Sequence, residues 1–285
     1  NCKRWKGPLI CLPSADVKEI FRGNEVFTGG VGQWDVSLIT DMQGMFRGCK
    51  KFNTGLNNWN VSSVTNMRSM FEDCTLFNGV ITDWDVTSVR SMRSMFRGCK
   101  RFNADLNNWN VSSVTDMKSM FGKCEKFIGV GLEQWGAVSV TNMRGMFRGC
   151  IVLETDLNDW NVSSVTSMSS MFENCTLFNE AITDWDVTSV RSMRRMFRGC
   201  KKFNADLNDW NVSSVKNMRS MFEDCTLFNG VITAWDVTSV RDMRSMFEHA
   251  KSFNRDISAW KPKVTSSMNS MFKGALTFDS EVEEW

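Results

Sequence analysis

The sequence predicts an α/β repeat solenoid with one short parallel strand and one short helix in each unit of 25 residues. The dipeptide Met-Phe recurs ten times between Met45-Phe46 and Met271-Phe272, and successive copies are 25 residues apart except for one step of 26. A Trp recurs in phase with it, from Trp34 to Trp285. A fixed period of this length is typical of solenoids, in which each unit buries its apolar face only by stacking on its neighbours.

The first half of a unit has the pattern of a short strand. In the unit that begins at Leu56, Trp59 and Val61 alternate with polar residues. Alternation with a period of two places one set of side chains on the inner face of a strand. Because the pattern repeats in every unit, we expect the strands to stack in parallel.

The second half of a unit has the spacing of a short helix. Its apolar residues recur at i, i+3, i+4 and i+7, in the unit above as Met67, Met70, Phe71 and Cys74. This spacing makes one apolar stripe on a helix. Ser63 or Thr65 can cap its first turn. The glycine that several units carry just before the Cys suits a C-terminal turn.

Eight of the ten cysteines occupy one slot of the repeat, three residues after the Phe: Cys49, Cys74, Cys99, Cys124, Cys150, Cys175, Cys200 and Cys225. Ala250 and Ala275 fill the slot in the last two units, so it favours a small buried residue. Parallel side chains on a ladder have poor disulfide geometry, and a row lacks the convergence that metal ligands need. We therefore expect a reduced, buried ladder. Cys2 and Cys11 lie outside it, and whether they form a disulfide is open, as is the redox compartment.

Residues 1–33 are expected to form an N-terminal cap with a degenerate unit around Phe21 and Phe27, and residues 34–285 a solenoid of ten units. The sequence stops at Trp285, in the middle of an expected strand. We therefore expect the C-terminal end of the array to be incomplete, either because the polypeptide continues or because another chain covers it. The start at Asn1 suggests a processed N-terminus or a fragment.

One residue is inserted between Gly129 and Ala137, where the register of the repeat breaks once. Two interpretations are open. The insertion is either a tolerated bulge or a functional interruption at which a partner docks.

The complete repeat reads W-[DN]-V-[ST]-S-V-T-x-M-x-x-M-F-x-x-C-x-x-F-N-x-D-L. The apolar spacing of its first half resembles the core of leucine-rich repeats, with Trp and Val in place of Leu. The whole motif, over about residues 34–285, resembles the BspA-like, DUF285 surface-protein repeats. This resemblance implies an extracellular binding or adhesion module without enzymatic activity, located at the cell surface, secreted, or in an organelle lumen.

Asp and Asn alternate in the slot after Trp, where we expect the side chains to be exposed. They are the candidate binding residues: Asp35, Asn60, Asp85, Asn110, Asn161, Asp186, Asn211 and Asp236. A row of this kind on a sheet face can bind calcium or a glycan. It can equally be a solvated ladder with internal hydrogen bonds, and both interpretations stay open. A second ladder, from Asn53 to Asn254, is expected to cap backbone groups of the return loop. The arginines, among them Arg68, Arg93 and Arg194, are expected to form a cationic band interrupted by acids.

No motif for catalysis, nucleotide binding or metal binding is present. His249 is the sole histidine and takes a surface slot filled by Gly or Asp in other units. The net charge of +2 gives no reason to expect nucleic acid, and no apolar run approaches the ~20 residues of a transmembrane helix. We therefore expect a non-enzymatic protein-interaction or scaffold module without a cofactor, acting alone or as a subunit of a larger assembly. A calcium- or glycan-binding, lectin-like protein is the alternative.

Overall fold

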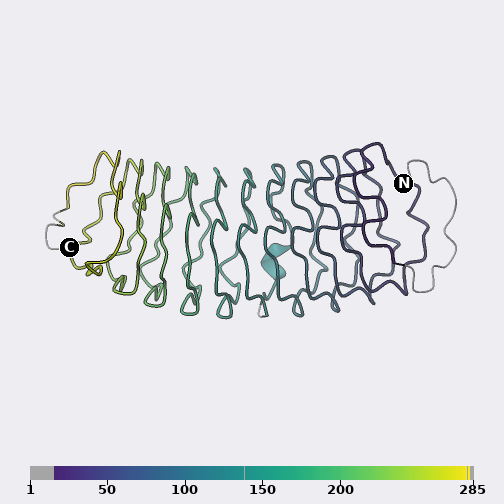
Figure 1. The fold of residues 1–285 in the computed structure, drawn as a ribbon, viewed down its shortest axis with the longest axis horizontal. Coiled ribbons are helices and arrows are strands. Elements are labelled where there is room, and N and C mark those ends of the chain that lie inside the picture. Colours follow the sequence, from purple (N-terminus) through teal and green to yellow (C-terminus); the bar gives the residue numbers. More distant parts are fainter. Residues whose placement is uncertain (1–15, 138, 281, 283–285) are drawn as a thin grey trace.

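The computed structural model describes residues 16–137, 139–280 and 282. The chain winds into a stack of similar coils along one axis, and each coil is one unit of the repeat (Figure 1). Nine isolated parallel bridges join successive units in the described chain, from Asp41↔Asn66 to Asp242↔Ser267. The predicted repeat solenoid is therefore confirmed, with the expected parallel register.

The expected strand is reduced to a single bridging residue per unit, and it lies later in the unit than predicted. Residues 56–64 form tight turns, in which the amide of Trp59 donates to Leu56 O (2.9 Å) and that of Val64 to Val61 O (2.9 Å). These turns bury Leu56, Trp59, Val61 and Val64, so Trp59 and Val61 alternate with exposed residues without forming a strand. The period of two was therefore not specific to a strand.

The expected helix is replaced by a series of tight turns. The amides of Met70, Glu72 and Cys74 each donate to a carbonyl three residues earlier, as that of Met70 does to Met67 O (3.2 Å). The amides in between donate to the next unit, as that of Ser69 does to Arg93 O (2.8 Å). An α-helix would direct these bonds into its own backbone. Here half of them hold the units together.

Left-handed residues exclude a helix at this place. Ser69 and Asp73 have φ of 54° and 60°, and the equivalent Gly44 and Gly48 have φ of 60° and 75°. A left-handed residue ends an α-helix, and two of them four residues apart leave no room for one. The predicted helix is therefore wrong, and with it the capping roles of Ser63 and Thr65. In the described residues the one helical element is η1, a 3₁₀ turn at Leu132–Gln134.

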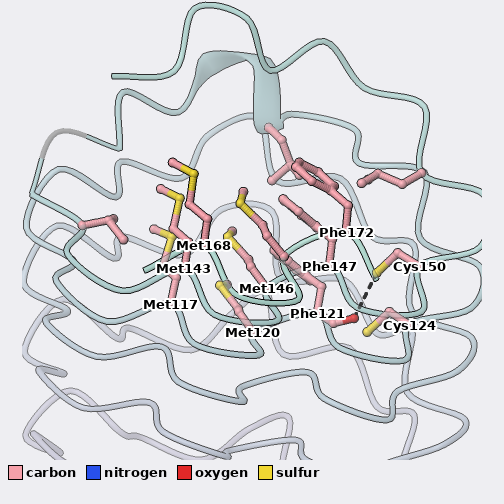
Figure 2. Close-up of a cluster of buried hydrophobic side chains, with 14 of the residues drawn as sticks. Met117, Met120, Phe121, Cys124, Met143, Met146, Phe147, Cys150, Met168 and Phe172 are labelled. Carbon is pink, nitrogen blue, oxygen red and sulfur yellow. Dashed lines mark hydrogen bonds between the residues drawn. The ribbon is translucent and has the colours of Figure 1, made fainter. Parts of the chain in front are cut away.

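The core consists of parallel rows of identical side chains. Figure 2 shows separate rows of Met, Phe and Cys, with one member of each row per unit. Phe71 stacks on Phe77 of its own unit (ring centroids 4.1 Å apart) and on Phe96 of the next (5.7 Å). The Trp rings form another row, with Trp59 and Trp84 6.5 Å apart. Continuous ring stacking across units explains why the repeat retains aromatic residues in these slots.

The inserted residue is absorbed by η1, the short ribbon near the middle of Figure 1. Gly129 and Gly131 adopt φ of 99° and 89° on its N-terminal side. Leu132 and Trp135 nevertheless remain buried in the core rows (0% and 2% exposed). The structure thus accommodates the insertion at the surface. A docking role for it stays a prediction.

The described part of the expected N-terminal cap continues the pattern of the solenoid. The amides of Phe21 and Gly23 donate to Met45 O and Arg47 O (3.0 and 2.7 Å), as in later units. The domain boundary at residue 33 stays a prediction, and Cys2 and Cys11 lie outside the described residues. No helix in the described chain is long and apolar enough to cross a membrane.

Candidate functional site

The predicted Asp/Asn row forms an exposed line with one side chain per unit, on turns rather than on a sheet face. Each side chain receives a hydrogen bond from the backbone amide two residues later, at 3.0–3.2 Å. In Asp85, the Oδ1 atom also accepts a bond from the Thr87 hydroxyl (2.6 Å). This arrangement is an Asx turn. The row therefore has a structural role in shaping its own loops.

These hydrogen bonds favour the charged carboxylates. The pKa values of Asp85, Asp186 and Asp236 are lowered, first by the hydroxyl and then by the amide of the Thr two residues later. In the described part of the chain, no three His, Cys, Asp or Glu side chains are grouped as a metal site would need. Calcium or glycan binding by the row stays a prediction.

The second polar ladder behaves as predicted. The Oδ1 atom of Asn53 accepts a hydrogen bond from the amide of Asn78 in the next unit (2.7 Å). Asn78 does the same for Asn103 (2.7 Å). The ladder is interrupted where Ile128 and Glu154 take the slot, and it resumes at Asn179 and runs to Asn254 and Asp279 (3.2 Å). The ladder therefore satisfies backbone amides that would otherwise lack a partner along the return loop.

The eight ladder cysteines are free thiols and fully buried, as predicted. Each Sγ also donates to the Phe carbonyl of the preceding unit, as Cys74 does to Phe46 O (2.9 Å), a contact that the sequence did not reveal. Burial raises the pKa of Cys49 to about 12, and the pKa values of the deeper cysteines rise as well. The thiolate is the reactive form, so the row is unsuited to nucleophilic chemistry.

A long recess of the described surface runs along the solenoid beside the cysteine row. It has a volume of about 1040 Å³, and its walls are the residues directly before and after the Cys or Ala slot of seven successive units. We call this recess the Cys-edge groove. It begins at Lys100, ends at Lys251 and passes Ile151, Thr176 and Lys201.

The groove has an excess of positive charge. Of its charged residues, Lys100 pairs with Glu125 (2.8 Å) and His249 lies 3.2 Å from Asp224. Lys123, Lys201 and Lys251 also line it and form no ion pair within the described chain; they are its free lysines. Directly after the lining Thr176 and Thr226 stand two exposed leucines, Leu177 and Leu227 (39% and 50% exposed).

Sequence reasoning missed this groove. It placed His249 in a surface slot without a site, and the residue sits in a left-handed turn (φ 59°) on the groove wall. The residues before and after the Cys vary among units. Their shared position beside one buried slot was the available signal.

The family is identified by a model described as "Mycoplasma protein of unknown function, DUF285", which matches residues 15–130, 122–226 and 205–285. The chain belongs to the DUF285 family. This confirms the resemblance carried by the repeat motif. No curated protein matches the chain.

Among solved structures, the chain is similar to a leucine-rich repeat protein from Eubacterium ventriosum, with 12% identity, coverage of 82% of this chain and 80% of that one, and a TM-score of 0.44. A leucine-rich repeat protein from Bacteroides ovatus is 15% identical, with coverage of 91% and 79% and a TM-score of 0.36. An internalin from Listeria monocytogenes is 10% identical, with coverage of 78% and 72% and a TM-score of 0.26.

Proposed function

We propose that this DUF285 protein is a non-enzymatic interaction module that binds an extended, acidic polypeptide segment in the Cys-edge groove. The observation that carries the proposal is the groove itself, which runs without interruption across seven units. Extended concave surfaces of this kind are the usual binding surfaces of solenoids.

The length of the groove fits an extended peptide. Six steps between seven units, at ~4.8 Å per step, give about 29 Å. At ~3.3 Å per residue, an extended segment of about nine residues fills this length. A compact small molecule would occupy only a fraction of it.

The charge of the groove fits an acidic partner. The free lysines Lys123, Lys201 and Lys251 are distributed along it, so that an extended chain meets them in succession. The exposed Leu177 and Leu227 offer apolar contacts beside them. A partner that alternates Glu or Asp with apolar residues satisfies both.

The test is fluorescence anisotropy with a labelled ten-residue peptide of alternating Glu and Leu, and a Lys-Leu peptide for comparison. We expect saturable binding of the acidic peptide alone. Charge reversal of the three free lysines to Glu should abolish it. A matched control reverses three exposed arginines that lie outside the groove, Arg90, Arg191 and Arg241. Equal losses in both triple variants would show that binding follows net charge, and the groove proposal would fail.

We also propose a cell-surface, secreted or luminal location for the protein, alone or in a larger assembly, as the family resemblance implies. Surface biotinylation of intact source cells tests the first of these locations. The lectin-like alternative has its own test, which is titration with calcium together with a glycan array. If the Asp/Asn row binds either ligand, replacing Asp85, Asp186 and Asp236 by Asn should weaken that binding.

A further inference from the structure

Two slots of the repeat each carry a row of cationic residues along the solenoid, and the two rows differ in their ion pairs. In the slot after Phe, arginines alternate with glutamates. Arg148 and Arg198 both contact Glu173 (3.0 and 3.4 Å), and Arg198 also contacts Glu223 (2.8 Å). Glu173 is itself buried, with 1% of its side chain exposed. This row neutralises its own charge.

The other row occupies the slot after the first Met of each unit, and we call it the cationic row: Arg68, Arg93, Lys118, Arg144, Arg194, Arg219 and Arg244. Among the described residues, only Arg244 of this row forms an ion pair, with Asp242 (2.8 Å). The remaining charges repel one another. The pKa of Arg194 is lowered by burial and then by Arg195 and Arg219. The pKa of Lys118 is lowered by burial and by neighbouring arginines as well.

The cationic row is interrupted once, at Ser169, and an extra arginine stands beside the gap. Arg195 occupies the slot before the second Met, which holds Ser in most units and Gly in two. Its φ of 57° equals that of Ser220 one unit further, so the backbone does not differ there. Both departures from the repeat thus alter side chains only.

A pocket of about 320 Å³ opens at this gap. Arg144 comes from the preceding unit, Ser169 from the unit with the gap, and Arg194 and Arg195 from the next. The Ser169 and Ser192 hydroxyls lie 2.8 Å apart on its wall. Since the share of one water molecule is ~30 Å³, the pocket has room for a polyatomic ion.

The charge in the pocket is not balanced by the protein. Arg148 and Glu173 also line the pocket, so four arginines face one carboxylate. Glu173 is already bound by Arg148 and Arg198. The guanidinium groups of Arg144, Arg194 and Arg195 therefore lack an acidic partner in the pocket. An anion in the pocket offsets the repulsion among these like charges.

We propose that this pocket binds a tetrahedral oxyanion, a sulfate or phosphate group, between Arg144, Arg194 and Arg195, with hydroxyl donors from Ser169 and Ser192. Donors from three successive units approach from several sides, which suits a group with more than two oxygens better than a planar carboxylate. The pocket shares no lining residue with the Cys-edge groove. The two proposals therefore stand or fall separately.

The test is isothermal titration of the full chain with inorganic sulfate and inorganic phosphate at constant ionic strength, with chloride as the balancing salt. We expect saturable binding to one site. Arg195→Ser should weaken the affinity at least tenfold, and Ser169→Arg should abolish binding because it fills the gap. Both variants restore residues that other units carry in the same slots, so the fold should be retained. Arg93→Ser, in the same row but outside the pocket, should leave the affinity unchanged.

Glucose 6-sulfate and glucose 6-phosphate then distinguish the two sources of the oxyanion by which one binds more tightly. The proposal is overturned if the unmodified chain shows no saturable binding above chloride. It is equally overturned if Arg195→Ser and Arg93→Ser weaken binding to the same extent, because the effect would then belong to the whole row.

Discussion

The indole N–H groups of the Trp row provide a matched pair of substitutions. Trp109 and Trp135 are both 2% exposed, and they stack on each other at 6.3 Å and on their outer neighbours at 6.2 Å. The Nε1 atom of Trp109 donates to Ile81 O (3.1 Å), as its equivalents do in other units. The Nε1 atom of Trp135 is buried without a partner in the described structure.

The inserted residue is the physical cause of the difference. The regular acceptor lies 28 residues before the Trp, as for Trp84 with Leu56 O and Trp160 with Leu132 O. The insertion at η1 lies between Trp135 and its equivalent acceptor. With the insertion, the Trp135 ring stays in the stack, but its Nε1 atom loses the hydrogen bond that most other units form.

Replacement of each Trp by Phe removes the same ring area, and this cost cancels between the two variants. Trp109→Phe also loses a buried hydrogen bond with a net value of ~1 kcal/mol. Trp135→Phe instead removes an unsatisfied donor, whose burial costs ~1–3 kcal/mol. We therefore expect Trp109→Phe to be more destabilising by at least about 2 kcal/mol.

The assay is urea unfolding followed by circular dichroism, with midpoints compared at unchanged slope. Trp84→Phe serves as a second regular position and should match Trp109→Phe. Equal losses at positions 109 and 135 would refute the reasoning, because the hydrogen bond would then contribute nothing to the difference.

Three further predictions concern the other rows. Cys124→Ala should cost about 1 kcal/mol, the net value of the lost bond from Sγ to Phe96 O, and native thiol labelling should be slow because the raised pKa keeps the thiol protonated. Lys123 has a φ of 64°, which glycine adopts without strain. Lys123→Gly should therefore raise the free energy of unfolding by up to about 1 kcal/mol and with it the urea midpoint. Lys123→Ala should raise neither. The lowered aspartate pKa values contribute stability above the unfolded value of ~3.9 that is lost as pH falls through the lower folded values. Melting temperatures at pH 7 and pH 3 should therefore differ less after triple Asn substitution of Asp85, Asp186 and Asp236.

The period of the sequence was sufficient to predict the stacking, the core slots and the Asn ladder. Each of these depends only on which residue recurs in register, and register is read directly from a 25-residue repeat. The buried Cys row followed from the same reasoning, since Ala250 shows that the slot requires small size.

The conformation within a unit could not be read from the same spacing. The i, i+3, i+4, i+7 pattern buries one face of a helix, but consecutive tight turns bury the same residues. Glycine in two slots four residues apart, as at Gly44 and Gly48, was the signal for left-handed turns. It was interpreted as a single helix end. The groove was missed for a related reason, because its walls depend on where the turns direct residues that vary from unit to unit.

Periodic and aperiodic features of this chain have different meanings. A residue that recurs in every unit is explained by the ladder it belongs to, as the hydrogen bonds of the Asp/Asn row show for Asp85 and Thr87. A residue that departs from its slot without altering the backbone has no such explanation. Ser169 and Arg195 are of this second kind, and together they form a pocket with unbalanced charge. An array built from the consensus unit alone should therefore retain the fold and its stability while lacking oxyanion binding, since nothing in the core rows depends on either residue.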